Sequence, residues 1–394
     1  MKENVFDNVL LITGGAGFIG SHLTNYLVRN YPNYRIIVLD KIDYCSNLKN
    51  IHVYDYPNFK FYKGNILDQL LLNHIFLNEK IDIVFHLAAY SHVDNSFFDS
   101  IKFTENNIMG THYLLEMSKQ YSIQKFIYVS TDEVYGGGNS ISDNSNNSIS
   151  NKVLPANENI TILKPTNPYS ASKAGAEQLV SSYYHSFQLP IIITRGNNTY
   201  GPFQYPEKII PKFIYQLNDN KPCTIHGTGE NKRSFIYIDD MIKAFDIILK
   251  KGLIGETYNI GTDFEISNLD VANTLISLYK NDIKNNNNNK NIIDNQLIRY
   301  IPDRPFNDYR YFINCSKLKN LGWQQSIPWE MGIKLTFDWY TKNKNYWSTT
   351  TTTTSISAPD PITFDKINKN NQQQQNEKKI STTTTTLILC SNDD

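Results

Sequence analysis

Two carboxylic acids stand side by side in the segment STDEVYG, where Asp132 and Glu133 follow the predicted buried strand KFIYVS. Neighbouring side chains on a strand point to opposite faces, and neither acid helps to build an apolar core. The pair is either part of a solvated loop or a pair of proton-transfer groups. Two carboxyl groups can act as a proton donor and a proton acceptor when their environments separate their pKa values. The groups that converge on this strand end decide between the two interpretations.

A second candidate pair, Tyr169 and Lys173, stands four residues apart in the segment NPYSASKAGAEQ. Because Pro168 favours the first turn of a helix, we expect both side chains on one helix face. A phenol has a pKa of about 10 and is protonated near neutral pH. A lysine ammonium group one turn away and a positively charged nicotinamide would lower that pKa and make Tyr169 a usable base. In isolation the same spacing describes an ordinary helix surface, so the interpretation depends on a dinucleotide motif elsewhere.

A glycine motif of that kind, TGGAGFIG, follows the first predicted strand and opens the first predicted helix, with glycines at Gly14, Gly17 and Gly20. At such a turn the backbone can approach a pyrophosphate at the helix N-terminus. Asp40 ends the second predicted strand, where a carboxylate would accept hydrogen bonds from ribose hydroxyls and repel a 2′-phosphate. This position favours NAD over NADP, although the charge of Lys41 beside it acts in the opposite direction.

Short apolar runs alternate with helix-length segments over the first half of the chain. Continuous apolar runs are typical of parallel strands that are covered on both faces, and strands that alternate with helices predict a doubly wound sheet. The fold class that we predict is therefore α/β, with a Rossmann-type parallel sheet. The predicted strands are NVLLIT, YRIIVLD, FKFYKG, IDIVFHLAA, KFIYVST and PIIITR, and the helical segments include FIGSHLTNYLVRN and NIMGTHYLLEMSKQ.

Composition and pattern divide the chain into three predicted parts. Residues 1–195 form an NAD-binding Rossmann domain, and residues 196–347, with shorter strands and more loops, form a smaller substrate-binding lobe. Residues 348–394 carry Thr and Gln runs that cannot bury enough apolar surface to offset their ordering entropy, so we predict a disordered tail. The Asn-rich stretches at 139–151 and 281–291 are predicted to be polar insertions.

The overall composition excludes several classes of protein. The chain of 394 residues carries 38 basic and 38 acidic side chains, which argues against nucleic acid as the main partner. No apolar stretch reaches the ~20 residues that a membrane span needs, and the polar start MKENVFDN is not that of a signal peptide. The four cysteines form no CxxC pair, and no spacing of His and acidic residues suggests a metal. We expect a soluble, cytoplasmic protein.

Six motifs in a fixed order carry a family resemblance: TGGAGFIG, HLAAYSHVD, STDEVYG, YSASK, NNTYGP and DRPFND. They resemble the nucleotide-sugar 4,6-dehydratases of the extended short-chain dehydrogenase/reductase superfamily. The resemblance runs from about Val9 to Tyr340 and leaves out the polar insertions and the tail. The order of the motifs, together with the TDE triplet, is more specific than any motif alone.

The resemblance implies a role for each catalytic residue. Tyr169, assisted by Lys173, takes the proton from the sugar 4-hydroxyl while the C4 hydride passes to NAD. Glu133 then removes the acidified C5 proton, and Asp132 protonates the departing 6-hydroxyl. Thr131 hydrogen-bonds the 4-oxygen, and the hydride returns to C6 to give a 4-keto-6-deoxy sugar. The two acids must then hold opposite protonation states, which differential burial can arrange.

The same resemblance implies the binding positions for the cofactor NAD and for a nucleotide-diphosphate sugar. The cofactor positions are Gly14, Gly17, Phe18, Ile19, Gly20, Asp40, Lys41, Asn65, Ile66, Leu87, Ala88, Ala89, Ser91, Asn106, Tyr169 and Lys173. The substrate positions are Thr131, Asn198, Lys208, Arg233, Asn268 and Arg304. Cationic and amide groups from a second lobe suit two phosphates on physical grounds as well. A homodimer formed through two helices of each subunit is implied by the resemblance.

Other functions on the same fold stay open at this point. A 4-epimerase needs no acid pair, and the glucuronate decarboxylases of this branch resemble TSE rather than TDE, so Asp132 argues for dehydration. A non-catalytic NAD-binding regulatory module is a distant alternative, because every catalytic position is filled. The choice between thymidine and uridine as the nucleoside depends on loop details that the motifs do not contain.

Overall fold

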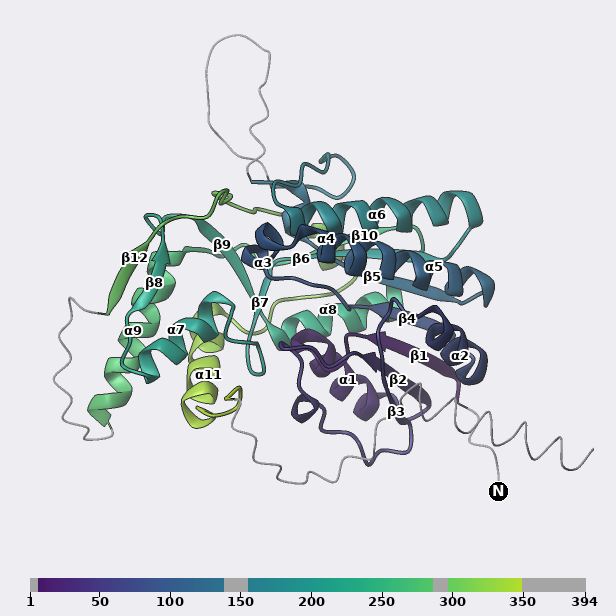
Figure 1. Ribbon diagram of the computed structural model, residues 1–394, viewed down its shortest axis with the longest axis horizontal. Helices are drawn as coiled ribbons and strands as arrows, with labels where there is room; N and C mark the ends of the chain where they lie inside the picture. Colours follow the sequence, from purple (N-terminus) through teal and green to yellow (C-terminus); the bar gives the residue numbers. More distant parts are fainter. Residues whose placement is uncertain (1–5, 138–154, 286–296, 349–394) are drawn as a thin grey trace, which may run out of the picture.

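A seven-stranded parallel sheet forms the body of the protein (Figure 1). The structure is a computed structural model that describes residues 6–137, 155–285 and 297–348. The strand order is β10-β6-β5-β4-β1-β2-β3, and every neighbouring pair is parallel. This order reverses between β1 and β4, as in a doubly wound sheet, which confirms the predicted fold class. The strands are β1 (Asn8–Thr13), β2 (Tyr34–Asp40), β3 (Phe59–Lys63), β4 (Ile83–His86), β5 (Lys125–Thr131), β6 (Ile191–Gly196) and β10 (Thr257–Ile260).

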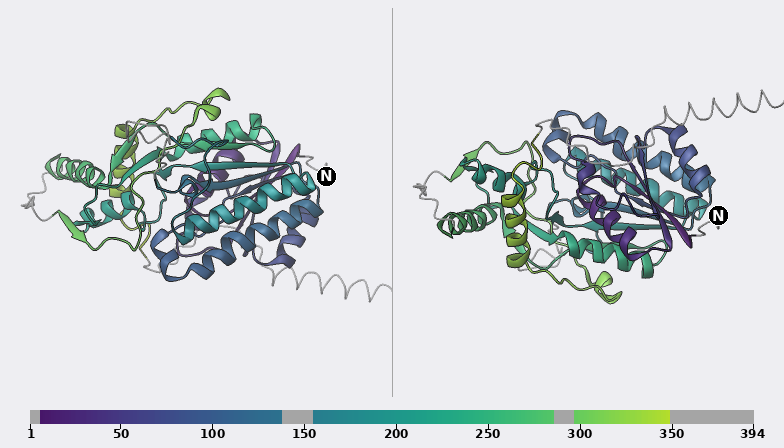
Figure 2. Two further views of the ribbon diagram at one scale, coloured as in Figure 1. Left: turned by 90° about the horizontal axis from the view of Figure 1, so that it is seen from above. Right: turned by 90° about the horizontal axis from the view of Figure 1, so that it is seen from below.

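Helices cover both faces of the sheet, so its strands are apolar almost throughout (Figures 1 and 2). On β2, Ile36 and Val38 point into one hydrophobic core, while Ile37 and Leu39 point into the other. This alternation explains why an uninterrupted apolar run is needed where both faces are buried. One face carries α1 (Phe18–Asn30) and α8 (Ile238–Lys251), and the other carries α2 (Gln69–Glu79), α5 (Gly110–Gln120) and α6 (Pro168–Phe187).

A long helical segment after β4 contains a π-helical stretch. The chain passes from α3 (Val93–Phe98) through α4 (Ser100–Phe103) into the π-helical η2 (Thr104–Met109) and then directly into α5. Asn106 and Asn107 lie in η2 and are buried. A π-helical turn inserts an extra residue into a helix and is frequent at functional sites. Here it turns two amide side chains toward the interior of the protein.

A smaller lobe follows the carboxyl ends of the strands and contains two short sheets (Figure 1). One sheet has the order β11-β9-β7, and the other pairs β12 with β8 in parallel. Their strands are β7 (Asn198–Tyr200), β8 (Cys223–His226), β9 (Lys232–Tyr237), β11 (Glu265–Ser267) and β12 (Ile298–Ile301). The remaining helices are α7 (Ile209–Asn218), α9 (Asn268–Asn285), α10 (Ser316–Asn320), α11 (Trp329–Lys342) and two short 3₁₀ turns, η1 (Leu48–Asn50) and η3 (Asp132–Tyr135).

Two predicted boundaries differ from the observed elements. The predicted domain boundary at residue 195 does not separate the large sheet from the smaller lobe. The chain returns to the large sheet after this residue, through α8 and β10. Residues 281–285, predicted as part of a polar insertion, are the last residues of α9, where the buried side chain of Ile283 joins the hydrophobic core. The rest of that insertion, the stretch 139–151 and the tail from residue 349 lie outside the described residues. Within the described part of the chain, no helix is long and apolar enough to cross a membrane.

Candidate active site

A cavity lies at the carboxyl ends of the central strands, between the large sheet and the smaller lobe. Its lining comes from the turn after β1, the end of β2, the loop after β4, the end of β5, the start of α6 and several segments of the lobe. A crevice at this edge of a doubly wound sheet is the usual place for a ligand. All of the predicted site residues are among the described residues, and Asp132 is the one that does not line the cavity.

The turn between β1 and α1 is built for close approach of another group to the backbone. Gly14 has a φ angle of +73°, and a Cβ atom there would lie 2.8 Å from the backbone nitrogen of Ala88. A Cβ atom on Gly20 would lie 2.1 Å from the carbonyl oxygen of Gly14. Both positions therefore require glycine, and the turn leaves the N-terminal N–H groups of α1 facing the cavity end of the sheet. This geometry fits the pyrophosphate of a dinucleotide.

Asp40 ends β2 and is tied to the glycine turn by hydrogen bonds. Its Oδ2 atom accepts from the backbone N–H of Ala16 at 2.9 Å, and its Oδ1 atom accepts from the backbone N–H of Ile42 at 2.8 Å. Burial raises the pKa of Asp40, and these two hydrogen bonds act in the opposite direction. The carboxyl group stands at the end of β2, beside the space that a ribose occupies in a doubly wound fold. Its role in ribose binding stays a prediction.

The charge of Lys41, which opposed the predicted preference for NAD, has partners inside the protein. Its Nζ atom lies 3.0 Å from the carboxylate of Asp43 and donates to the hydroxyl of Tyr90 at 2.6 Å. The ammonium group also lies 4.0 Å from the centre of the Tyr90 ring. Because Asp43 balances the charge of Lys41, the ammonium group offers less attraction to a 2′-phosphate than its sequence position suggests.

Tyr169 and Lys173 lie on the first two turns of α6. Asn167 caps this helix, with its Oδ1 atom accepting from the backbone N–H of Ser170 at 2.8 Å, and Pro168 is the first helical residue. Lys173 is 3% exposed, and its Nζ atom donates to the carbonyl oxygen of Val129 at 2.7 Å. Burial lowers the pKa of Lys173 to about 7. The lysine is therefore held against β5, on the side of the helix that faces the cavity.

The side chains around Tyr169 favour the protonated form of its phenol. Burial and the charge of Glu133 both raise the pKa of Tyr169 above its ordinary value. The side chain is 8% exposed and packs edge-on against the ring of Phe103. A positive charge brought into the cavity would lower this pKa, because an opposite charge nearby favours the ionised form of a phenol.

The two acids do not continue the strand, because the chain turns into η3 directly after Thr131. The Thr131 hydroxyl starts this turn by accepting from the backbone N–H of Glu133 at 3.3 Å. Thr131 also donates to the Oδ1 atom of Asp132 at 3.2 Å. The turn separates the surroundings of the acids, since Glu133 lines the cavity and Asp132 lies behind its wall.

Asp132 and Glu133 differ in burial and in partners. Asp132 is 2% exposed, and its Oδ2 atom accepts from the Nδ2 group of Asn197 at 2.7 Å. Burial raises the pKa of Asp132 to about 7, the hydrogen bond from Asn197 lowers it and the charge of Glu133 raises it further. Glu133 is partly exposed, and its Oε2 atom accepts from the Nδ2 group of Asn167 at 3.1 Å and lies 3.5 Å from the hydroxyl of Tyr311. One carboxyl group can thus keep a proton near neutral pH beside another that can accept one.

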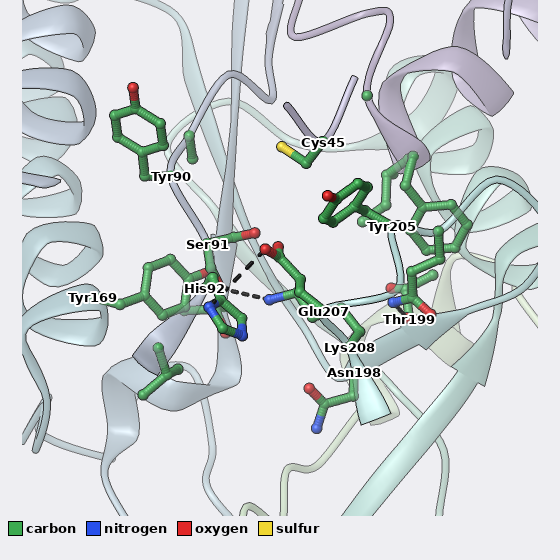
Figure 3. A pocket seen from close by; sticks show the side chains of 18 of the residues that line it. Cys45, Tyr90, Ser91, His92, Tyr169, Asn198, Thr199, Tyr205, Glu207 and Lys208 are labelled. Carbon is green, nitrogen blue, oxygen red and sulfur yellow. Dashed lines mark hydrogen bonds and ion pairs between the residues drawn. The ribbon is translucent and has the colours of Figure 1, made fainter. Parts of the chain in front are cut away.

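The lobe brings basic side chains to the same cavity. Lys208 reaches across it and donates from Nζ to the carbonyl oxygen of Ser91 at 2.6 Å (Figure 3). The Nε atom of Arg304, which follows β12, lies 2.6 Å from the Oδ1 atom of Asp94 in α3. Both contacts join the lobe to the loop and helix after β4. The lobe therefore supplies positive charge on the side of the cavity opposite the glycine turn.

Arg233 and the loop after β12 complete the lobe side of the cavity. The guanidinium group of Arg233 lies 4.8 Å from the centre of the Tyr311 ring and donates to the Oδ1 atom of Asn307 at 3.1 Å. The hydroxyl of Tyr311 donates to Asp308 as well as lying near Glu133. A basic group, an amide and a phenol are thus held together at the edge of the acid pair.

Known proteins that are similar to this chain agree with the site that the geometry indicates. The family model described as GDP-mannose 4,6 dehydratase matches residues 11–336. A dTDP-D-glucose 4,6-dehydratase of Dictyostelium discoideum is 60% identical over 369 residues, which cover 88% of this chain and 84% of that protein. The chain belongs to the nucleotide-sugar 4,6-dehydratase family. The family resemblance predicted from the motifs is therefore confirmed.

Two further relatives of this 4,6-dehydratase are similar over most of its length. A crystal structure of dTDP-glucose 4,6-dehydratase from Streptomyces venezuelae, with NAD and TYD bound, has a TM-score of 0.74 and 34% identity and covers 86% of this chain and 99% of that one. A trifunctional UDP-glucose 4,6-dehydratase of Arabidopsis thaliana is 50% identical over 340 residues, 86% of this chain. The chain spans 48% of the length of that plant protein.

Three amides in this 4,6-dehydratase were not identified from the sequence. Asn167 joins the cap of α6 to Glu133, and its position before Pro168 is a helix-start signal that could have identified the cap. Asn197 contacts Asp132 across two strands, and nothing local to its own segment indicates that contact. Asn107 holds the loop after β4 by accepting from the backbone N–H of Tyr90 at 2.8 Å and donating to its carbonyl oxygen at 3.0 Å. These amides hold the acid pair and the loop after β4 in place, although none of them belongs to a motif that indicates this role.

Proposed function

We propose that this protein is an NAD-dependent hydro-lyase that converts dTDP-glucose to dTDP-4-keto-6-deoxyglucose. The observation that carries the proposal is the acid pair, in which a buried carboxyl with a pKa of about 7 stands beside a partly exposed carboxyl next to Tyr169. An elimination at adjacent carbons needs both a proton donor and a proton acceptor. The dTDP-D-glucose 4,6-dehydratase from Dictyostelium, at 60% identity, supports the choice of substrate.

The cofactor side of the cavity fits NAD. The glycine turn, Asp40 and the loop residues Leu87 to Ser91 surround the space at the carboxyl ends of β1, β2 and β4. The residues around this space would hold NAD, whose nicotinamide would supply the hydride acceptor for C4 and the hydride donor for C6 of the sugar. The protein supplies orientation, a closed space and the proton-transfer groups. Asn65, Ile66 and Asn106 complete the lining on this side, where we assign them to cofactor contacts.

The oxidation half of the reaction requires a base at the 4-hydroxyl. We assign this base to Tyr169, with Thr131 donating a hydrogen bond to the same oxygen. Lys173 holds its place against Val129 and, when protonated, stabilises the phenolate from one helical turn away. Burial raises the pKa of Tyr169, and the positive charge of a bound NAD would lower it.

The elimination half uses the acid pair. Glu133, which lines the cavity, removes the C5 proton that the 4-ketone has made acidic and returns a proton to C5 when the hydride adds to C6. Asp132 supplies a proton to the departing 6-hydroxyl. Its Oδ1 atom lies behind the hydroxyl of Thr131, so a proton on Oδ1 is one hydroxyl group away from the cavity. Burial favours the protonated form of Asp132, the form that this step requires of the acid.

The lobe holds the nucleotide diphosphate in this proposal. The cationic side chains Lys208, Arg233 and Arg304 line the cavity on the lobe side. Charge-assisted hydrogen bonds from lysine and arginine suit phosphate oxygens, and the amides of Asn198 and Asn268 add neutral donors beside them. Two phosphates and a sugar would then span the cavity from the lobe to the acid pair.

UDP-glucose is the second candidate substrate. The 50% identity to a trifunctional UDP-glucose 4,6-dehydratase favours it, and the two nucleotide sugars share the diphosphate and the glucose that the proposed contacts recognise.

We further expect a cytoplasmic homodimer that pairs through α5 and α6, which lie side by side on one face of the sheet (Figure 1).

One experiment tests the proposed function directly. Purified protein is incubated separately with dTDP-glucose, UDP-glucose and UDP-glucuronate, and the products are followed by mass spectrometry and NMR. We expect loss of one water and a 4-keto-6-deoxy sugar, with faster turnover of dTDP-glucose. A 4-epimer with unchanged mass, or loss of carbon dioxide from a nucleotide-glucuronate, would identify another activity of this fold. Binding of NAD with no conversion of any nucleotide sugar would support a regulatory module.

A further inference from the structure

The buried amide of Asn197 connects the acid pair to the segment that follows β10. Parallel strands β5 and β6 pair Thr131 with Gly196, so the next residues, Asp132 and Asn197, lie side by side. On the other side β6 pairs with β10, and the backbone N–H of Asn197 donates to the carbonyl oxygen of Ile260 at 2.9 Å. Asn197 is 5% exposed. The register of three strands thus places this side chain between the general acid and the smaller lobe.

The orientation of this amide is determined by its neighbours. The Oδ1 atom of Asn197 accepts from the backbone N–H of Thr262 at 3.0 Å. A backbone N–H group can only donate, so it must face the amide oxygen and not the amide nitrogen. The Nδ2 group then faces the Oδ2 atom of Asp132, at 2.7 Å. Asn197 can therefore only donate a hydrogen bond to this carboxyl group.

A donor at Oδ2 decides where Asp132 carries its proton. An oxygen that accepts a short hydrogen bond cannot at the same time present its own proton to that donor, so the proton of the neutral acid belongs on Oδ1. Oδ1 faces the hydroxyl of Thr131 at 3.2 Å, and Thr131 lines the cavity. Unlike the amide group of Asn197, this hydroxyl can turn to accept a hydrogen bond from a protonated Oδ1. We propose that Asn197 is a positioning residue that keeps the proton of Asp132 on the oxygen directed toward the substrate. This inference rests on the proposed function, because it assigns a role only within a reaction that uses Asp132 as an acid.

Gly261, directly after β10, leaves the space that the amide of Asn197 occupies. A Cβ atom on Gly261 would lie 1.9 Å from the Oδ1 atom of Asn197 and 2.6 Å from its Cγ atom. Any larger residue at 261 would displace the amide from its place between Thr262 and Asp132. The substitution Gly261→Ala therefore offers a second way to move the amide without changing its chemistry.

Other titratable and charged groups also act on Asp132. Glu133 belongs to the same turn, and its charge raises the pKa of Asp132. Arg233, on β9, lowers that pKa, and the hydrogen bond from Asn197 lowers it as well. Tyr169, on α6, has its own pKa raised by the charge of Asp132. A change at Asn197 must therefore be measured with these groups intact.

The pH dependence of turnover tests the inference. If Asp132 acts in its protonated form, activity falls as the pH rises through the pKa of this acid. Donation from Asn197 stabilises the ionised form, so its loss raises the pKa and moves the alkaline limb of the profile upward. Asn197→Asp keeps an oxygen for Thr262 but replaces the donor with a second carboxyl group. We expect the limb to move upward by about one pH unit or more. Although more of the acid is then protonated at neutral pH, kcat should fall about tenfold with a smaller change in KM, because the proton is no longer held on Oδ1.

A matched control separates this effect from a loss of packing. Asn259 on β10 is also a fully buried amide, which donates to the carbonyl oxygens of Ala156 at 3.1 Å and Asn314 at 3.0 Å. Asn259→Asp introduces the same change one strand away and removes no hydrogen bond to Asp132. We expect this control to lower the unfolding temperature without moving the alkaline limb. Asn197→Ala and Gly261→Ala provide the same test if Asn197→Asp does not fold.

The outcomes distinguish the inference from the proposed function. A wild-type protein that forms no 4-keto-6-deoxy product overturns the proposed function. A wild-type dehydratase whose alkaline limb is unmoved in folded Asn197→Asp and Asn197→Ala variants overturns the role of Asn197 alone. The titration of Asp132, followed by infrared difference spectra against Asp132→Asn, gives a readout that does not depend on turnover. An upward shift of that titration in the Asn197 variants supports the inference, and an unchanged titration contradicts it.

Discussion

The two sides of the cavity are constructed in different ways. On the sheet side, the cofactor region depends on backbone geometry, since Gly14 and Gly20 leave no room for a side chain and Asp40 is bonded to backbone N–H groups. On the lobe side, long side chains such as Lys208 and Arg304 cross to partners on the other half of the protein. A backbone site tolerates no change of shape, whereas a site of long side chains can change its contacts when a ligand arrives. We expect the first side to control folding and cofactor binding and the second to control substrate affinity.

The largest expected effect comes from a single methyl group on the sheet side. Gly20→Ala places Cβ 2.1 Å from the carbonyl oxygen of Gly14, a backbone atom that cannot move aside. We expect loss of NAD binding and turnover and a marked drop in unfolding temperature, measured by titration and calorimetry. Gly175→Ala in α6 is the control, because its Cβ would meet only the end of the Ile108 side chain at 3.0 Å. Equal behaviour of the two variants would show that the sheet side is less rigid than its geometry indicates.

Between the two sides, the acid pair should affect chemistry but not binding. Glu133→Gln removes the base for the C5 proton while oxidation at C4 stays possible. We expect turnover to fall by about 10²–10⁴-fold, and reduced-nicotinamide absorbance with a 4-keto-glucose nucleotide to accumulate. Tyr169→Phe should lose as much activity with no such absorbance, since the 4-hydroxyl has no base. Stopped-flow absorbance after mixing with substrate distinguishes the two variants. Near wild-type product formation by the Glu133 variant would mean that the pair is a solvated loop.

A smaller effect is expected on the lobe side. Arg304→Ala removes one cationic group from the proposed diphosphate site, and hydrogen bonds to charged groups contribute about 1.5–3 kcal/mol, so KM should rise ~10–100-fold. The unfolding temperature should change little, because the Arg304–Asp94 pair is partly solvated. Arg299→Ala, on the exposed part of β12, is the control and should leave KM unchanged. A loss of kcat with unchanged KM would assign Arg304 to the chemistry instead.

The smallest effect should follow removal of the segment after Ser348. Its Thr, Gln and Asn runs offer few apolar side chains that could add to the core. A chain that ends at Ser348 should keep its unfolding temperature, its affinity for NAD and its turnover. Thermal unfolding and steady-state kinetics of the shortened and full chains make the comparison. A clear loss in either measurement would mean that this segment contributes to the folded protein, contrary to the prediction.

Sequence patterns predicted the local features of the site better than the contacts between segments that are distant in the chain. The apolar run that ends in Asp40 matches β2 residue for residue, because parallel strands covered on both faces have a distinctive composition. Tyr169 and Lys173 follow from the spacing of a helix. Asn197 and Asp132 meet although 65 residues separate them, so their contact depends on strand register and not on any local pattern. The return of β10 to the large sheet was also missed, because a strand of four residues at the edge of a sheet has too little periodicity to detect.

Because β10 comes late in the chain, one edge of the large sheet stays exposed while the protein is being synthesised. This strand pairs with β6, yet it follows β6 by about 60 residues, which include part of the smaller lobe and α8. When the first 195 residues have left a ribosome, the backbone N–H and C=O groups on the outer side of β6 have no strand to pair with. Open strand edges of this kind promote association between chains. The nascent protein thus has an aggregation-prone interval that ends only when β10 emerges, and a fragment cut at residue 195 would keep that edge permanently.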